Sequence, residues 1–477
     1  MASEIRVNKI NSRTGVGTIT LSPTGVDFTG IATVATLKAT TGIVTTLTAT
    51  TGIVTTLTVD TARTTTGIVT TLTADTAKVG AAVTISESGM EVTGVTTVTS
   101  SINIGSATTI SSSSLEVNGV QYPTAGALSN RNLVINGAMQ VAQRGTSSTS
   151  DGYLVDRINI GDSGGTRTRT QESLSSGSPY EEGFHKFVRV TNTSAGSNNA
   201  SDYVFIRHTL EDQDIANSGW NYESTSSYIT CSFWVRSSVS QEFYAHFNQG
   251  TDAYNYAVSI GTLAANTWTK ITKTIPGNSN LSFSNDNTGG LEINIIPFWG
   301  TNFTTSGSTV DAWYAWNGAS RVPDMTTTWN TTASATFDVT GLQIEVGEKA
   351  TPFEHRNYGD ELARCQRYFY RIGGDSVDTA LGIGAVYSGT QINVHLDLPC
   401  AMRTKPSAST TGASNWLYVA QGASSQARNS TPSIGDGGDI NLTTLRLFIE
   451  SLSGLTTGYA VWCLVNANHS LDFSAEL

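Results

Sequence analysis

Aromatic side chains crowd into residues 298–329, in a stretch otherwise rich in Asn, Thr, Ser and Gly. Flat aromatic rings bind the apolar C–H faces of sugar rings, while nearby amides and hydroxyls can satisfy the sugar hydroxyls. The pattern therefore predicts a sugar-binding platform. The candidate residues are Trp299, Trp313, Tyr314, Trp316 and Asn317, with Asp311 and Arg321 as further polar partners. The alternative is that these aromatics pack in a core or between subunits.

A second aromatic group lies near the end of the chain. Trp416 and Tyr418 sit within a long polar segment, residues 414–433, which a Gly/Asp-rich GDGGD sequence follows. Polar loops of this length are frequent sites of contact with partners. Trp416 and Tyr418 are therefore added to the candidate ligand-binding residues, with Tyr459 and Trp462 as the remaining aromatic residues of this region.

Motifs for catalysis and metal binding are weak. Residues 161–165 read GDSGG, as around the nucleophile of trypsin-like proteases, but the first histidine, His185, comes after it, so we interpret the motif as a flexible loop. The histidines show no metal-ligand spacing, and residues 285–287 lack the closing Glu of a calcium loop. We therefore expect that the protein binds no metal and no cofactor and that it is not an enzyme. A glycan-cleaving carboxylate pair stays an alternative, because only its spatial separation defines it.

Composition restricts the partners. Only 14% of the residues are charged, and the net charge of −11 without a cluster of Lys and Arg argues against nucleic acid. No apolar run is long enough to span a membrane, and the first residues lack the apolar core of a signal peptide. The four cysteines are far apart and are expected to be buried free thiols. We expect the protein to be kept in a cytosol-like compartment until it is assembled or released.

A short phrase, TGIVTTLT, begins at residues 41, 51 and 66. Its β-branched residues favour extended strands, and each copy is too short to bury its own apolar residues. The glycine spacing is irregular, which disfavours a solenoid of one chain and favours three chains around one axis. A disordered linker is the alternative. The predicted trimer core consists of Ile43, Leu47, Ile53, Leu57, Ile68 and Leu72.

The remaining sequence predicts globular β domains around one helix. Alternating strand patterns cover residues 187–191, 228–237, 241–248, 267–274, 291–297 and 335–346, and later 390–398, 445–451 and 459–466. A helix is predicted for Asp360–Arg371, capped by Asp360. The predicted fold class is mainly β, and the predicted assembly is an elongated homotrimeric fibre. The expected parts are an attachment segment (1–29), a β shaft (30–127), a β-sandwich of the jelly-roll type (128–358), a connecting helix (359–372) and a small β-rich tip (373–477).

Two stretches carry a resemblance to a known family. Residues 132–145 (NLVINGAMQVAQRG) with 151–158 (DGYLVDRI), and residues 337–371, resemble the two ends of a domain in tail-fibre and other receptor-binding proteins of tailed bacteriophages. That domain is similar to the jelly rolls of carbohydrate-binding modules. The Thr/Val/Gly-rich region resembles fibre shafts of phages that infect marine bacteria.

The resemblance implies a homotrimer attached to the tail or capsid of a virion through its N-terminus, assembled in the host cytoplasm. It would adhere to a surface glycan or an envelope protein of the host. A glycan depolymerase and a purely structural virion fibre are the alternatives.

Overall fold

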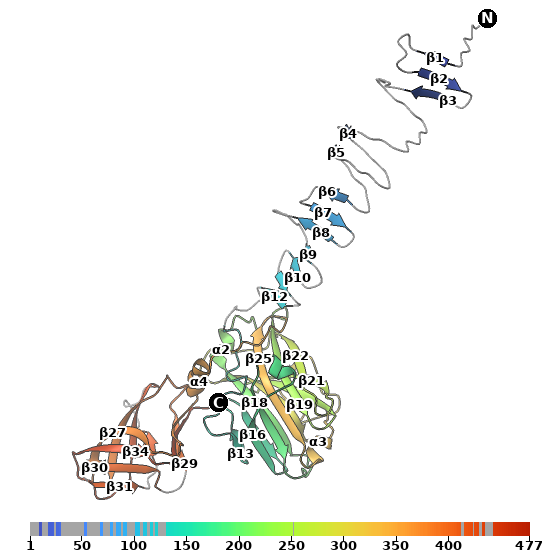
Figure 1. Ribbon diagram of the computed structural model, residues 1–477. Helices are drawn as coiled ribbons and strands as arrows, with labels where there is room; N and C mark the ends of the chain where they lie inside the picture. The colour runs from blue at the N-terminus through green and yellow to red at the C-terminus, as the bar shows by residue number, and fades with distance from the viewer. Residues whose placement is uncertain are drawn as a thin grey trace. The chain divides into compact units, whose positions relative to one another are not determined.

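The computed structural model describes residues 130–250, 252–411, 415–422, 424–428, 432–434 and 442–477, together with short strands between residues 9 and 122 (Figure 1). The described residues are mainly β-strand, as the sequence predicts. The chain divides into two units, Met1–Thr97 and Val98–Leu477.

The described strands of the first unit form three small sheets. β1 (Lys9–Asn11), β2 (Thr18–Ser22) and β3 (Gly25–Thr29) are antiparallel, as are β6 (Ala77–Val79), β7 (Val83–Ser86) and β8 (Gly89–Val92).

The third sheet of this unit joins two copies of the repeated phrase. β4 (Gly52–Val54) and β5 (Gly67–Val69) pair in parallel, with Ile53 opposite Ile68. Two successive repeats thus pair within one chain. The irregular glycine spacing had favoured contacts between three chains over pairing within one chain. The other four residues of the predicted trimer core, Ile43, Leu47, Leu57 and Leu72, lie outside the described residues.

The second unit begins with a four-stranded antiparallel sheet and continues into a β-sandwich of two larger antiparallel sheets (Figure 1). The small sheet contains β9 (Ser101–Ile104), β10 (Thr108–Ser111), β11 (Leu115–Val117) and β12 (Val120–Tyr122). The six-stranded sheet has the order β13 (Ser147–Ser148), β16 (Arg167–Ser173), β17 (Lys186–Asn192), β25 (Thr336–Val346), β19 (Tyr228–Ser237), β22 (Thr269–Pro276). The seven-stranded sheet has the order β14 (Gly152–Tyr153), β15 (Asn159–Ser163), β18 (Tyr203–Glu211), β23 (Gly289–Trp299), β20 (Glu242–Gln249), β21 (Tyr254–Thr262), β24 (Trp313–Ala315).

Alternating apolar residues of both sheets form the main core of the sandwich. In β19, Cys231, Phe233 and Val235 point to this core, and in β23, Leu291, Ile293 and Ile295 do so from the opposite sheet. Successive strand residues point to opposite sides, so the residues between them face outward from each sheet. The strand predicted for residues 228–237 is confirmed at its full length, and the other predicted strands of this domain lie within about two residues of the observed ends.

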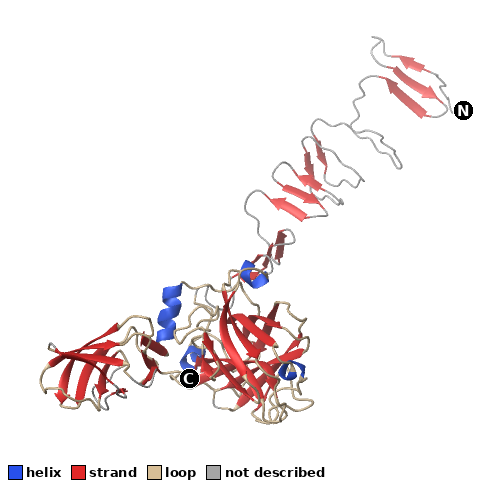
Figure 2. Ribbon diagram, turned by 60° about the horizontal axis from the view of Figure 1, so that its bottom comes forward, coloured by secondary structure: helices blue, strands red, loops and turns tan. Residues whose placement is uncertain are grey.

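The helices are short and lie at the margins of the sheets (Figure 2). Those in the described residues are α1 (Ser178–Glu181), α2 (Asp212–Ala216), α3 (Thr328–Thr331) and α4 (Tyr358–Gln366). The prediction of a helix from Asp360 to Arg371 was wrong at both ends. Asn357 caps α4 by accepting a hydrogen bond from the Asp360 backbone N–H at 2.9 Å, and the last predicted turn is instead strand β26 (Phe369–Gly373). Aromatic residues favour this strand, and Phe369 is buried where it pairs with β35 (Ser470–Ser474).

The described strands of the C-terminal domain form two sheets around a second core (Figure 1). The order β26, β35, β29 (Ser407–Thr411) forms a three-stranded sheet. The larger sheet has the order β31 (Ser424–Arg428), β30 (Leu417–Gln421), β34 (Ala460–Val465), β27 (Thr379–Ser388), β28 (Gln391–Asp397), β33 (Thr444–Ile449), β32 (Pro432–Ile434). The predicted strands 390–398, 445–451 and 459–466 are confirmed within two residues at each end.

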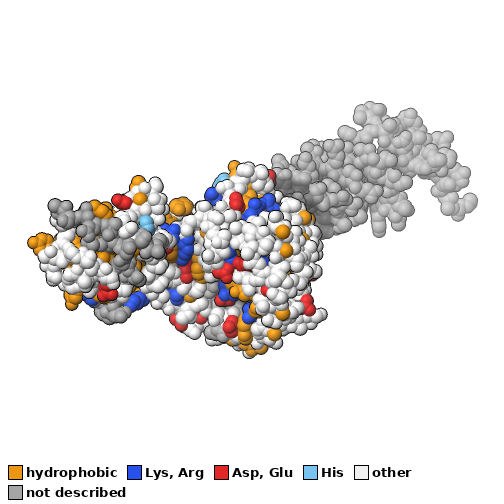
Figure 3. Space-filling model, turned by 90° about the horizontal axis from the view of Figure 1, so that it is seen from below, with side chains coloured by type: hydrophobic (Ala, Val, Ile, Leu, Met, Phe, Trp, Pro, Cys, Tyr) orange, Lys and Arg blue, Asp and Glu red, His pale blue; other side chains and the backbone are white. Residues whose placement is uncertain are grey.

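Charged side chains join the sandwich to the C-terminal domain. Arg367 donates to both carboxylate oxygens of Glu211 at 2.8 Å, and Arg157 pairs with Glu476 at 2.5 Å. Arg403 donates to the backbone carbonyl of Asn287 at 2.6 Å. Elsewhere the visible surface carries few charged atoms (Figure 3). Arginine provides several donors in a rigid fork and therefore suits such buried junctions.

Asp156, beside this junction, makes stability depend on pH. Burial raises the pKa of its carboxyl to about 6, despite the hydrogen bonds that it accepts from Gln143. The folded chain therefore holds more protons than the unfolded chain between about pH 4 and pH 6, and its stability falls as the pH rises through this window. Relative to Asp156→Asn, the wild type should lose up to about 3 kcal/mol there. Denaturation curves at several pH values check this, and equal pH slopes for both proteins would contradict it.

Candidate functional site

Trp299, the first candidate of the sugar-binding platform, is buried. Its side chain is 3% exposed and packs in a small core with Tyr244, Ile296 and Val322. This core forms because the connection from β23 to α3, residues 300–327, folds over the outer face of the seven-stranded sheet. The ring of Trp299 therefore offers no face to a ligand in this conformation.

Trp313 and Tyr314 do not form a common platform. The two residues are neighbours in β24, and their side chains therefore point to opposite sides of the sheet. Trp313 packs against the main core and donates from its indole N–H to the Pro276 carbonyl at 2.6 Å. Tyr314 packs against the small core and donates its hydroxyl to the Arg321 carbonyl. Both side chains are engaged in structural contacts.

Trp316 and Asn317 are the accessible members of this first group. Trp316 is half-buried, with the Arg321 guanidinium carbon 4.5 Å from its ring centroid. Asn317 is exposed, but its side-chain oxygen accepts the Ala319 backbone N–H at 3.0 Å and closes a turn. Asp311 is exposed as well. The structure thus separates the accessible residues of the group from the buried tryptophans.

The two candidates of the C-terminal domain also differ in exposure. Trp416 is 1% exposed and belongs to the second core. Tyr418 is half-buried and lies opposite Leu464 in the ladder of β30 and β34. Half of the long polar segment between residues 414 and 433 lies outside the described side chains.

The GDSGG motif has a structural role. Residues 161–163 end strand β15 instead of forming the flexible loop that we expected. The Asp162 carboxylate pairs with Arg167 at 2.8 Å. Gly164 has a φ of 81°, and a side chain there would collide with Asp202, so glycine is required at this turn. These contacts explain the motif without a nucleophile.

Metal ligands and disulfides are not found among the described residues. Residues 285–287 form part of a turn in which Asp286 accepts from Thr288, while Asn287 donates to the Arg403 carbonyl at 2.6 Å. The expectation of buried thiols is confirmed for Cys231, Cys365 and Cys463, and Cys400 is half-buried. No helix in the described part of the chain has the length and apolar character needed to cross a membrane.

The outer face of the seven-stranded sheet carries a more accessible aromatic group on β18. Tyr203, Phe205 and Arg207 alternate with Val204 and Ile206, which point to the main core. Tyr203, Phe205 and Arg207 are all half-buried, and together we call them the β18 strip. The strip lies on the half of the outer face that is nearer to β15.

The two rings of the β18 strip are nearly parallel. Their centroids are 5.7 Å apart and their planes differ by 15°. The Phe205 ring lies against Gly161 of β15, where an added Cβ would come within 2.4 Å of it. Glycine at position 161 thus allows the ring to lie close to the sheet. The result is an aromatic surface that continues along the strand.

Arg207 completes the β18 strip with a fixed polar group. Its guanidinium carbon lies 4.4 Å from the Phe205 ring centroid. Its Nε donates to the Asn294 side chain at 2.7 Å, and it pairs with Glu292 at 3.3 Å. Both partners come from neighbouring β23. They hold the guanidinium in one orientation over the Phe205 ring, which places a planar donor at this end of the strip.

The other half of the outer face is closed by the 300–327 connection and contains buried polar groups. His246 is 1% exposed, and its ring meets that of Trp299 at an angle of 66°. Burial, with the nearby charge of Arg321, lowers its pKa to about 3, so the ring is neutral at physiological pH. The 300–327 connection also reaches the β18 strip, where the ring of Phe303 meets the ring of Tyr203 edge to face.

The sequence prediction missed the β18 strip because β18 itself was not predicted. Residues 203–210 read YVFIRHTL, so that aromatic or polar residues alternate with Val, Ile, His and Leu. Period-two alternation indicates a strand with one face in a core. The alternating pattern of β18 was present in the sequence. The binding site was predicted instead at residues 298–329, because several tryptophans lie close together there.

Comparisons with known proteins give only remote likenesses. No protein-family model matches the chain, and no curated protein matches it. Among solved structures, the enzymatically active domain of tailspike protein 4 from bacteriophage CBA120 has a TM-score of 0.25 and 11% identity over 45% of this chain. This match spans about a fifth of the tailspike domain (21%).

Two carbohydrate-binding modules give similar values. A module described under "CBM4 structure and function" has a TM-score of 0.21 and 9% identity, and covers 44% of this chain and 97% of its own. The family 11 module of Clostridium thermocellum, bound to a mixed-linked tetrasaccharide, has a TM-score of 0.20 and 12% identity, with 44% and 98% covered. Likeness at these TM-scores and identities does not assign this chain to a family or a function.

Proposed function

We propose that this chain is a fibre protein of a tailed bacteriophage that attaches the virion to its host by binding surface glycans at the β18 strip. The observation that carries the proposal is the parallel pair Tyr203 and Phe205 beside the fixed guanidinium of Arg207. The resemblance of residues 132–145, 151–158 and 337–371 to phage receptor-binding proteins supports the viral part of the proposal.

The chemistry of the β18 strip suits a sugar. Aromatic faces attract the C–H faces of sugar rings, and a planar guanidinium donates paired hydrogen bonds to hydroxyl or carboxylate oxygens. Because Asn294 and Glu292 already fix Arg207, little side-chain freedom is lost when a ligand binds. A glycan is therefore the ligand class that matches the apolar and the polar groups of the strip together.

Three copies of the chain form the proposed fibre, with the N-terminal segment attached to the tail or capsid. The repeated phrase supports this assembly, since one copy of it has too little apolar surface to fold alone. Three weak glycan sites on one particle bind with much higher avidity than a single site. The proposed fibre is assembled in the host cytoplasm and carries no catalytic role.

A glycan array with the full-length protein tests the function. We expect binding to a set of related host-surface glycans, and a loss of at least about tenfold in affinity for Tyr203→Ala and for Arg207→Ala, because each removes a main contact of the strip. Tyr180→Ala is the matched control, since Tyr180 is 39% exposed and lies in α1, away from the outer face. Light scattering of the same sample should give three times the mass of the 50.4 kDa chain.

Two results would count against the proposal. Equal affinities of the wild type and both strip variants would remove the β18 strip as the site, and absence of binding to any host glycan would favour a purely structural fibre. Release of new reducing ends from host polysaccharide would instead establish the depolymerase alternative.

A further inference from the structure

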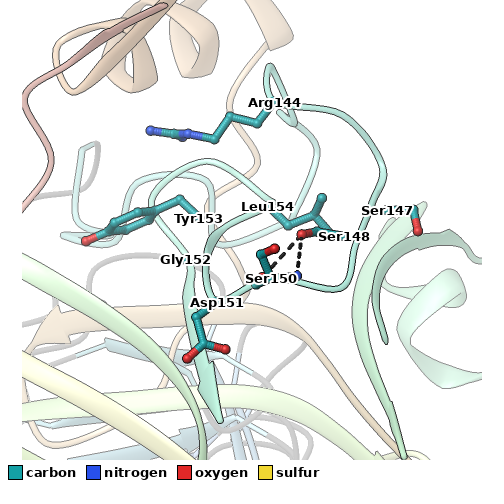
Figure 4. Close-up of a pocket in the computed structure, with 8 residues that line it drawn as sticks. All are labelled: Arg144, Ser147, Ser148, Ser150, Asp151, Gly152, Tyr153 and Leu154. Carbon is teal, nitrogen blue, oxygen red and sulfur yellow. Dashed lines mark hydrogen bonds between the residues drawn. The ribbon is translucent and has the colours of Figure 1, made fainter. Parts of the chain in front are cut away.

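A pocket of about 320 Å³ lies at one edge of the sandwich (Figure 4). It forms where residues 144–154 pass from the six-stranded sheet, at β13, to the seven-stranded sheet, at β14. The Ser148 hydroxyl accepts the Ser150 backbone N–H at 3.0 Å and donates to the Ser150 carbonyl at 3.2 Å, so the turn at its rim is closed (Figure 4). Its size is at the lower end of the range for small-molecule sites.

Tyr153 connects this pocket to the β18 strip. It lines the pocket and lies opposite Asn159 of β15 in the strand ladder. Asn159 in turn lies opposite Arg207 of β18. These three residues therefore lie in one row across adjacent strands, on the same face of the sheet. Two strand spacings separate Tyr153 from Arg207, about 10 Å. One oligosaccharide that crosses the strands can thus contact both.

The charges that line the pocket are already neutralised. Arg144 pairs with Glu476 at 3.1 Å and with Asp156 at 3.5 Å, and its guanidinium carbon lies 3.4 Å from the Phe369 ring centroid. Asp151 is paired with the buried Arg169. An anionic or cationic ligand would therefore find no uncompensated opposite charge among these groups, whereas a neutral ligand would keep every pair intact.

The remaining groups of the pocket favour a ligand with many hydroxyls. The lining contains the hydroxyls of Ser147, Ser148 and Ser150 and the half-exposed carboxylate of Asp151, which can accept further hydrogen bonds. The hydroxyls of Tyr153 and Ser148 are already used, because the first donates to the Leu477 carbonyl and the second makes both hydrogen bonds of the turn. Polar groups thus dominate the rim, as the recognition of a sugar unit requires.

We propose that this pocket is a second subsite, which holds one neutral sugar unit of the glycan whose other units lie on the β18 strip. The proposal rests on the proposed function, because the glycan must first bind to the strip. It adds a specificity: the unit in the pocket is uncharged, and the glycan must be long enough to span the row from Arg207 to Tyr153.

Two variants in one turn test the subsite. Ser150 is exposed and its hydroxyl makes no hydrogen bond within the described structure, so Ser150→Trp should fill the pocket without breaking the turn. Thr149 is also exposed but does not line the pocket, so Thr149→Trp adds the same bulk to the same turn as a control. Thermal denaturation of both variants confirms that the full-length protein is folded.

The probes are neutral oligosaccharides of the series that the wild type binds on the array, from two to about six units, and the same oligosaccharides ending in a uronic acid. We expect Ser150→Trp to weaken the longer neutral probes at least about tenfold and to leave the shortest probes unchanged. Thr149→Trp should bind all probes as the wild type does. The wild type should bind the neutral ends more tightly than the acidic ends.

The outcomes separate the two proposals. Unchanged binding of long probes by Ser150→Trp, together with loss of binding by Tyr203→Ala, would overturn the subsite and keep the function. Equal loss for short and long probes would also overturn the subsite, since a pocket at the end of the row is not reached by short probes. If the wild type binds acidic but no neutral oligosaccharides, the subsite is overturned and the function stands; if it binds no glycan at all, both proposals fail.

Discussion

Replacement of Arg157 by methionine is expected to destabilise the protein by about 3–5 kcal/mol, the usual cost of breaking a buried ion pair from one side. The Arg157 side chain is 1% exposed, pairs with Glu476 at 2.5 Å and donates to the Thr209 carbonyl at 2.5 Å. Its guanidinium carbon also lies 3.5 Å from the Tyr368 ring centroid. Methionine keeps much of the volume but leaves the carbonyl without its donor.

Calorimetric unfolding of the full chain measures this effect. The control is Lys270→Met, which removes the ion pair of Lys270 with Glu182, where both side chains are more than a third exposed. Exposed pairs contribute at most about 1 kcal/mol, so this variant should unfold close to the wild type. Similar destabilisation by both substitutions would show that the buried Arg157 pair contributes no more to stability than the exposed Lys270 pair.

Replacement of Trp329 by alanine should cost about 3–5 kcal/mol as well, since it leaves a large cavity in the main core. Trp329 is fully buried, its indole N–H donates to the Thr336 carbonyl at 3.0 Å, and its ring meets Phe337 edge to face. The substitution removes all of these contacts, and the sandwich has no way to refill the space without moving its strands.

A second tryptophan provides the comparison for Trp329. Trp462 is 49% exposed on β34, so Trp462→Ala should change stability by less than about 1 kcal/mol. Unfolding followed by calorimetry distinguishes the two variants. If both substitutions changed the free energy of unfolding equally, the difference in burial between Trp329 and Trp462 would be contradicted.

Strands with a regular apolar face were predictable from the sequence. Residues 228–237 alternate Ile229, Cys231, Phe233 and Val235 toward the core, and this strand was predicted at its full length. Period-two patterning is a local property, so it can be read without knowledge of the rest of the fold. The helix at residues 358–366 was located for a similar reason, although its cap and its end were misplaced.

The binding residues were harder to predict because exposure is not a local property. Trp299 has the residue type and the neighbours of a sugar-binding residue, yet the 300–327 connection covers it. Phe205 has fewer polar neighbours in sequence, yet Gly161 from another strand gives it room at the surface of the sheet. Only the pairing of β15 with β18 brings these two residues together, and no spacing along the chain indicates it.

The three-stranded sheet β26-β35-β29 gives the C-terminal domain a modular construction. Phe369 lies opposite Ser474 and Ser407 lies opposite the same Ser474, so the chain repeatedly departs from and returns to this small sheet. All strands of the larger sheet come from two excursions, residues 374–406 and 412–469. The first excursion runs from β26 to β29, the two outer strands, which lie about 10 Å apart on either side of β35, and the second runs from β29 to its neighbour β35, about 4.8 Å away. The larger sheet can therefore be exchanged as a unit by protein engineering while the contacts of Arg157 and Arg367 with their partners stay in place, provided that Arg403, which lies within the first excursion, is retained.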